Sequence, residues 1–154
     1  MFEVKVDWAC SISGGAEFID PWNLTIGVYS SIDKDCCIRC RGTVVIGTKC
    51  CISRGVDLLF GSHNISSPNF ELITTPIMIK DNVWIATEAM VSKGVIICEV
   101  SAVASMANAI KSVVVLLVVD GNSDNMLKNR ILTVDDGMSS SYFRYERGKD
   151  ALSF

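Results

Sequence analysis

Residues 79–109 read IKDNVWIATEAMVSKGVIICEVSAVASMANA, and an apolar residue recurs in this stretch at every sixth position. The recurring residues are Ile79, Ile85, Val91, Ile97, Val103 and Ala109. An amphipathic helix repeats near every 3.6 residues and a half-buried strand near every second residue, so neither accounts for this period. Six residues is the length of one side of a three-sided parallel β-coil, and the stretch therefore predicts that repeat architecture.

The same period extends toward the N-terminus with two restarts. The apolar positions there are Val6, Ile12 and Phe18, then Ile26, Ile32 and Ile38, then Ile46, Ile52 and Leu58. Each restart adds two residues, and Leu24 and Val44 keep the hydrophobic phase at the joins. Because three hexads make one turn, the sequence predicts about five turns in a single elongated coil.

The fifth position of each hexad is mostly small, as expected near the sharp corners of such a coil. Small residues there are Cys10, Ala16, Ser30, Cys36, Gly42, Cys50, Ser62, Ala89, Ser101 and Ala107. Val56, Val83, Val95 and Val113 are larger residues that still fit, and Trp22 is an exception. Gly27 and Gly47 directly follow a core position, where a missing Cβ allows a tight turn.

The repeat is interrupted once and then ends. Residues 62–78 contain Pro68, Pro76 and several Ser and Asn residues, which is typical of an excursion loop and a common place for a functional site. After the coil, residues 123–131 are predicted to form a short helix capped by Asn122 or Ser123. We therefore expect a β-helix domain over residues 1–112, followed by a C-terminal strand, helix and irregular tail over residues 113–154.

Composition narrows the function classes. The 154 residues are 49% hydrophobic with a net charge of -3, and no basic stripe is available to bind nucleic acid. The longest apolar run, residues 113–119, is much shorter than the roughly 20 residues that span a bilayer. The first ten residues lack the basic start and apolar stretch of a signal peptide, so we expect a cytoplasmic protein.

Seven cysteines allow either a packing role or a metal site. A zinc site needs four ligands brought together by short turns. The repeat instead places Cys10, Cys36 and Cys50 at the small fifth position, where cysteine packs as a compact apolar residue. Cys10, Ser30 and Cys50 are then expected to stack on one face, and we expect no metal.

His63 is the only histidine, and it lies in the segment GSHN where the coil gives way to the loop. A single histidine can be structural or catalytic. Its place at a corner beside the only long excursion favours a chemical role.

Residues 21–130 resemble the hexapeptide-repeat O-acetyltransferases, and most closely the acetyltransferases of colanic acid and other exopolysaccharide biosynthesis, which are relatives of maltose and galactoside acetyltransferases. The resemblance rests on PWNLTIG, VVIGTKCCISRG, GSHNISSPNFELITTPIMIKDNVWIATEAMVSKGVII and VVDGNSDNMLKNRIL, of which the third is the most specific. It implies an all-β, left-handed parallel β-helix that assembles as a homotrimer. It also implies transfer of an acetyl group from acetyl-CoA to a sugar hydroxyl.

The resemblance also implies roles for individual residues. His63 matches the catalytic base, which takes the proton from the acceptor hydroxyl. The positions that bind the cofactor are matched by Trp84, Ala86, Thr87, Ala104 and Lys111. At two of them the resemblance implies a specific contact: Thr87 offers a backbone N–H to the oxyanion, and Lys111 faces the nucleotide phosphates. Cys40 and Asn64 match positions near the acceptor sugar, Cys40 standing where near relatives have an asparagine.

Some residues depart from the family pattern, and they keep other functions open. Cys98, Val100 and Ala104 replace expected glycines, and GNSDN at residues 121–125 replaces the usual GNPAK. A degenerate scaffold that binds a sugar or a protein without turnover is therefore an alternative. A metal-dependent hydratase on the same coil is a further alternative, although one histidine per subunit lacks the usual three-histidine zinc set unless the symmetry of a trimer supplies it.

Overall fold

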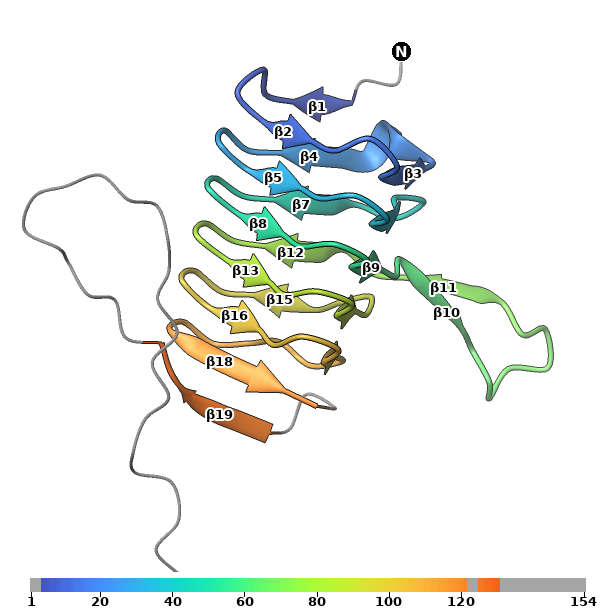
Figure 1. Cartoon of the computed structure of the whole chain (residues 1–154). Helices are drawn as coiled ribbons and strands as arrows, with labels where there is room; N and C mark the ends of the chain where they lie inside the picture. The colour runs from blue at the N-terminus through green and yellow to red at the C-terminus, as the bar shows by residue number, and fades with distance from the viewer. Residues whose placement is uncertain (1–3, 122–124, 131–154) are drawn as a thin grey trace, which may run out of the picture.

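The computed structural model describes residues 4–121 and 125–130, which form an all-β solenoid of about six turns (Figure 1). Each full turn contributes one short strand to each of three sheets, and these coil strands run parallel. The predicted three-sided coil is thus confirmed, with the expected five full turns and an incomplete sixth. The only helix among the described residues is the 3-10 turn η1 (Pro21–Asn23). None of the described residues forms a helix with the length and hydropathy to cross a membrane.

The sheets are named A, B and C in the order in which the chain visits them. Sheet A contains β1 (Lys5–Val6), β4 (Leu24–Ile26), β7 (Val44–Ile46), β12 (Ile77–Ile79) and β15 (Ile96–Ile97). Sheet B contains β2 (Ser11–Ile12), β5 (Ser31–Ile32), β8 (Cys51–Ile52), β13 (Trp84–Ile85), β16 (Ala102–Val103), β18 (Leu117–Asp120) and β19 (Asn125–Asn129). Sheet C contains β3 (Glu17–Ile19), β6 (Cys37–Arg39), β9 (Asp57–Leu58), β14 (Met90–Val91) and β17 (Asn108–Ala109).

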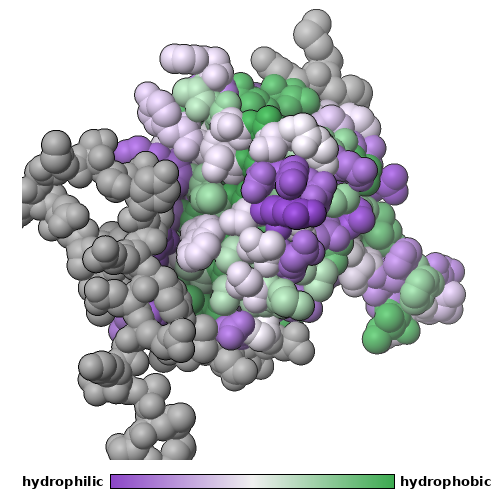
Figure 2. Space-filling view, viewed as in Figure 1, coloured by the Kyte–Doolittle hydropathy of each residue, from purple (hydrophilic) through white to green (hydrophobic). Residues whose placement is uncertain are grey.

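The six-residue positions face the inside of the solenoid and form its core. From Ile26 to Ala109 every one of them is at most 2% exposed, and so are the join residues Leu24 and Val44. The first turn is different: Val6 and Ile12 are 38% and 43% exposed, because no described coil covers β1 and β2 from the other side. Figure 2 shows the apolar surface that results at this end of the solenoid.

The small fifth positions also supply hydrogen bonds. Cys10 Sγ donates to the carbonyl of Gly27 at 3.1 Å, and Ser30 Oγ donates to the carbonyl of Gly47 at 2.7 Å. Cys50 Sγ donates to the carbonyl of Lys80 at 3.0 Å. The predicted stacking is confirmed, and the thiols satisfy corner carbonyls that the parallel sheets leave unpaired, which a purely apolar side chain would not do.

Gly27 and Gly47 are needed for a different reason from the one expected. Neither has a left-handed backbone angle. A Cβ on Gly27 would lie 2.7 Å from the carbonyl carbon of Gly47, and a Cβ on Gly47 would lie 2.8 Å from that of Lys80. Close approach of the next coil therefore excludes a side chain at both positions.

The end of the coil differs from the sequence prediction in two ways. Val113, expected at the fifth position of a hexad, instead forms a parallel bridge with Ile97 of sheet A. The last turn is therefore two residues shorter than the one before. The helix predicted over residues 123–131 is wrong for residues 125–129, which form β19 antiparallel to β18. Without a partner on its outer side, β18 would leave N–H and C=O groups unpaired at the edge of sheet B, and pairing with β19 satisfies them. Arg130 follows β19 and is described, whereas the remaining residues of the predicted helix, 123, 124 and 131, and the tail 133–154 lie outside the described residues.

Candidate functional site

The predicted excursion is a β-hairpin that projects from one edge of the solenoid (Figure 1). Its strands β10 (Gly61–His63) and β11 (Leu72–Thr74) pair antiparallel, with His63 opposite Leu72. The hairpin is inserted between β9 of sheet C and β12 of sheet A. We call the edge where sheet C passes into sheet A the hairpin edge; it comprises residues 20–23, 40–43, 59–76, 92–95 and 110–112.

His63 is exposed, and the hairpin holds its ring in one orientation. The ring stacks on Phe70 with centroids 4.5 Å apart and planes 4° from parallel. Its Nδ1 lies 2.8 Å from the carbonyl oxygen of Phe70. Because a carbonyl can only accept, Nδ1 must carry the proton in this hydrogen bond. In the neutral ring the lone pair is then on Nε2, which is the arrangement required of a general base.

Asn64 fixes the far part of the hairpin. Its backbone N–H donates to the carbonyl of Glu71 at 2.9 Å, and its Nδ2 donates to Glu71 Oε1 at 2.7 Å. Hydrogen bonds from Ser67, from the Glu71 backbone and from Asn64 lower the pKa of the Glu71 carboxyl. Asn64 therefore keeps the hairpin in shape, and contact with an acceptor remains a prediction for this residue.

Four of the five predicted cofactor residues lie together on sheet B and the corner that follows it. Trp84 is half-buried on β13, and its Nε1 donates to Ser53 Oγ at 3.0 Å. Ala86 is 2% exposed, and Ala104 occupies the same place one coil later. Thr87 is the second residue of a turn closed by a hydrogen bond from Ala89 N to Ala86 O at 3.2 Å.

Lys111 lies elsewhere, on the hairpin edge, where it is exposed. Lys93 lies on the same edge one coil earlier, and it lines a hollow of about 310 Å³ at the root of the hairpin. The other lining residues are Leu59, Gly61, Ser62, Ser92 and Ile110. Within one chain, Lys111 and His63 are thus on the hairpin edge. Sheet B and the corner that follows it carry the other four residues, here called the Trp84 group: Trp84, Ala86, Thr87 and Ala104.

Cys40 is also on the hairpin edge, but its side chain is 0% exposed. Burial, with a smaller contribution from Asp20 and Cys37, raises the pKa of its thiol to about 12. A buried neutral thiol presents no surface to an acceptor in the single chain. The exposed polar residue at this position is its neighbour Arg41.

The cysteines do not gather into a ligand set. All seven are free thiols, and within residues 4–121 and 125–130 no three His, Cys, Asp or Glu side chains are close enough to hold a metal ion.

Sequence reasoning missed the partners of the predicted residues, namely Phe70 for His63 and Ser53 for Trp84. The Ser-Pro-Asn segment at residues 67–69 is a turn signal that predicts a hairpin. The register that brings Phe70 back to His63 depends on strand pairing, which the local sequence does not specify.

Comparisons with known proteins agree with the solenoid fold. No family model matches the chain. The protein named putative colanic acid biosynthesis acetyltransferase WcaF, from Escherichia coli (strain K12), is 30% identical over 133 residues, which cover 86% of this chain and 73% of the relative. The protein of the same name from Shigella flexneri matches to the same extent.

Solved structures share the fold at lower identity. A hexapeptide-repeat acetyltransferase from Vibrio cholerae O1 biovar eltor, complexed with acetyl coenzyme A, aligns with a TM-score of 0.73 at 21% identity, covering 79% of this chain and 68% of that one. A maltose O-acetyltransferase from Clostridium difficile 630 aligns with a TM-score of 0.73 at 18% identity, covering 78% and 66%. With the solenoid and hairpin described above and the 30% identity to the Escherichia coli protein, the chain belongs to the hexapeptide-repeat acetyltransferase family.

Proposed function

We propose that this protein is an acetyl-CoA-dependent O-acetyltransferase that modifies a sugar hydroxyl in exopolysaccharide assembly, with His63 as the general base. Family membership supports the reaction class, and the name of the Escherichia coli relative supports a polysaccharide context. The observation that carries the proposal is the Nδ1 to Phe70 carbonyl hydrogen bond of 2.8 Å, which leaves Nε2 as the basic nitrogen of an exposed, stacked imidazole.

The proposed reaction is direct transfer. Nε2 of His63 takes the proton of the acceptor hydroxyl while that oxygen attacks the thioester carbon of acetyl-CoA. The tetrahedral intermediate carries its negative charge on the former carbonyl oxygen. A backbone N–H at Thr87 is the candidate donor to this oxyanion, since it occupies a corner whose turn is already closed by its neighbours. Collapse expels the coenzyme A thiolate, which recovers the proton from the imidazolium.

The separation of His63 from the Trp84 group gives the oligomer a role in this proposal. His63 projects from the hairpin edge, whereas Trp84 lies on sheet B. Both can line one site only if the hairpin of one subunit faces sheet B of the next. We therefore propose a cyclic homotrimer with three shared sites. The exposed apolar residues of the hairpin, Ile65 at 86% and Phe70 at 54%, are then available to contact the neighbouring subunit.

Calorimetric titration of acetyl-CoA into the protein, after its oligomer size has been measured, tests the cofactor. Saturable binding near one site per subunit is expected, with His63→Gln binding equally well but losing at least about a hundredfold in transfer rate, as for removal of a general base. Absence of binding would favour the catalytically degenerate scaffold.

Subunit mixing tests the shared site. His63→Ala and Trp84→Ala proteins are expected to be inactive alone. After co-refolding in equal amounts, a head-to-tail trimer regains about a quarter of the wild-type activity, because each mixed ring has one intact His63 and Trp84 pair. A site within one chain gives no recovery.

A further inference from the structure

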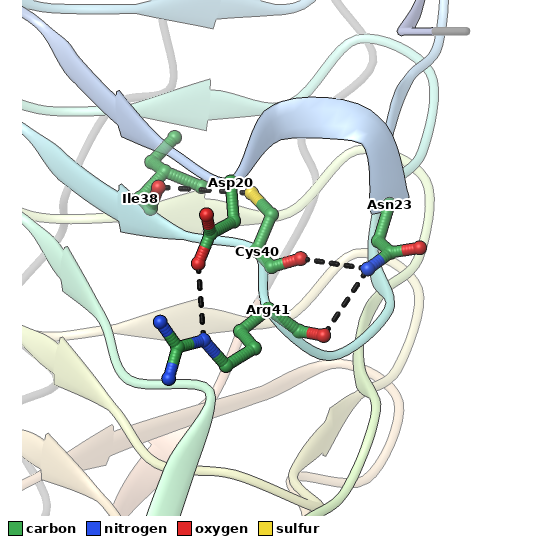
Figure 3. A network of polar contacts seen from close by, with 5 residues as sticks. All are labelled: Asp20, Asn23, Ile38, Cys40 and Arg41. Atoms are coloured by element: carbon green, nitrogen blue, oxygen red, sulfur yellow. Dashed lines mark hydrogen bonds and ion pairs between the residues drawn. The ribbon is translucent and has the colours of Figure 1, made fainter. Parts of the chain in front are cut away.

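Arg41, on the hairpin edge, is held in place by the preceding coil (Figure 3). Asn23 Nδ2 donates to the backbone carbonyls of Cys40 at 3.0 Å and Arg41 at 3.1 Å, which fixes the main chain. Arg41 Nε donates to Asp20 Oδ2 at 3.1 Å, which fixes the side chain. The guanidinium also lies over the ring of Phe60, 5.8 Å from its centroid.

The carboxylate that holds Arg41 comes from a backbone position that costs energy. Asp20 has φ 56, in the left-handed region, and it precedes Pro21, which further restricts it. The same angle recurs at other corners of the coil, for example at Asp35 with φ 61, so it belongs to the corner geometry. At this corner it places the Asp20 carboxylate against Nε.

The ion pair is asymmetric, and its exposed partner is the cation. The Arg41 side chain is 61% exposed and that of Asp20 only 21%. The Arg54–Asp35 pair, which also uses Nε and has an N to O distance of 2.8 Å, is exposed almost equally at 54% and 51%. Figure 3 shows the contact with Asp20 at Nε alone, and among the described residues no hydrogen bond from either η nitrogen is found. Arg41 therefore presents a fixed, positively charged fork to solvent.

The fork lies beside the start of the hairpin that carries the proposed base. Phe60, whose ring lies under the guanidinium, directly precedes β10, and the backbone of His63 follows three residues later, about 10 Å along an extended strand. Gly42, next to Arg41, would place a Cβ 3.5 Å from Thr74, the hairpin partner of Gly61. The Arg41 segment therefore packs at the root of the hairpin that carries His63.

We propose that Arg41 is a specificity residue that binds the carboxylate of an acidic sugar in the acceptor, a uronic acid or a similar carboxylated unit. The inference rests on the proposed function, because it assigns a substrate class to the same site. A guanidinium pairs with a carboxylate through two parallel N–H···O bonds. The Asp20 charge beside it disfavours a doubly charged phosphate, so a singly charged carboxylate is the better match.

The test compares two pairs of sugars that differ only at the acidic group. The methyl glycosides of galactose and galacturonic acid, and of glucose and glucuronic acid, are titrated by NMR into the wild-type protein loaded with coenzyme A. At least one acid is expected to bind about tenfold or more tightly than its neutral partner, as for a charge-assisted hydrogen bond. Arg41→Gln should abolish this preference, and Arg41→Lys should retain only part of it because the ammonium lacks the planar fork.

Arg54→Gln is the matched control, because it breaks an Nε ion pair of similar exposure at another corner and should leave the preference unchanged. Circular dichroism verifies that each variant is folded. Equal binding of the acidic and neutral sugars by the wild type, binding of none of them, or a preference that survives in Arg41→Gln would each overturn the proposal. Acetyl transfer is measured on the same samples: an intact preference without transfer contradicts the enzymatic function and not the carboxylate site.

Discussion

Replacement of Gly47 by alanine tests how tightly consecutive coils are stacked. The new Cβ would lie 2.8 Å from the carbonyl carbon of Lys80 and 2.9 Å from the amide nitrogen of Asp81, and it would also collide with Asp81 Oδ1. Overpacking against backbone costs about 1–3 kcal/mol. Asp81 Oδ1 accepts a hydrogen bond from the Thr48 N–H at 2.7 Å, and its displacement costs about 1.5–3 kcal/mol more.

Alanine also restricts the unfolded chain, which returns about 0.4–1 kcal/mol. The expected net loss for Gly47→Ala is thus about 2–5 kcal/mol, or a fall in Tm of roughly 5–15 °C for a chain of this size. Urea unfolding followed by circular dichroism measures it. Gly14→Ala is the control: a Cβ there meets nothing within 4 Å and its φ is not left-handed, so stability should stay level or rise slightly. If the two variants unfold within about 1 kcal/mol of each other, close coil stacking does not explain the glycine.

Three further changes have defined outcomes. Val100→Asn should raise Tm by about 2–4 °C in a thermal melt, because Val100 has φ 60 and asparagine tolerates that angle better. The equivalent position one coil earlier is already an asparagine, Asn82, with φ 58. Burial raises the pKa of the Cys40 thiol to about 12, so the unfolded chain loses this proton at a lower pH than the folded chain. The free energy of unfolding should therefore fall as pH rises from about 9 toward 12. Cys40→Val should show a smaller fall in urea midpoint between pH 8 and pH 10 than the wild type. Phe70→Ala should lower kcat up to about tenfold without changing acetyl-CoA affinity, because His63 loses the ring on which it stacks. An unchanged kcat in steady-state assays would exclude a positioning role for the Phe70 ring.

The fold could be predicted because each coil has the same three sides and therefore the same requirement for inward-facing residues. An inward residue every six positions must be apolar, and from Ile26 to Ala109 these residues are all at most 2% exposed. The last coil could not be placed in the same way. Residues 113–119 are all apolar, so the hydrophobic pattern fits any phase, and the pairing of Val113 with Ile97 selected a shorter turn.

The candidate site was only partly predictable. His63 and Trp84 are distinctive residue types in a specific motif, and the sequence predicts a role for both. Their partners belong to other strands: the carbonyl of Phe70 reaches His63 through hairpin pairing, and Ser53 reaches Trp84 through coil stacking. Arg41 also remained hidden, because its fixed orientation depends on contacts with Asp20 and Asn23 in the preceding coil.

Val100, where the resemblance leads us to expect a glycine, bears on stability more than on the shape of the coil. Val100 adopts φ 60, the left-handed angle that a glycine would provide at little cost. The neighbouring coils keep their register across this substitution, with Trp84 opposite Ala102 and Ile85 opposite Val103. A β-branched residue at such an angle costs about 1–2 kcal/mol, which the fully buried core positions on either side, Ile97 and Val103, can offset. Valine at position 100 therefore leaves the backbone path beside Ala104 in place, so this residue is not in itself evidence that the proposed cofactor site has degenerated.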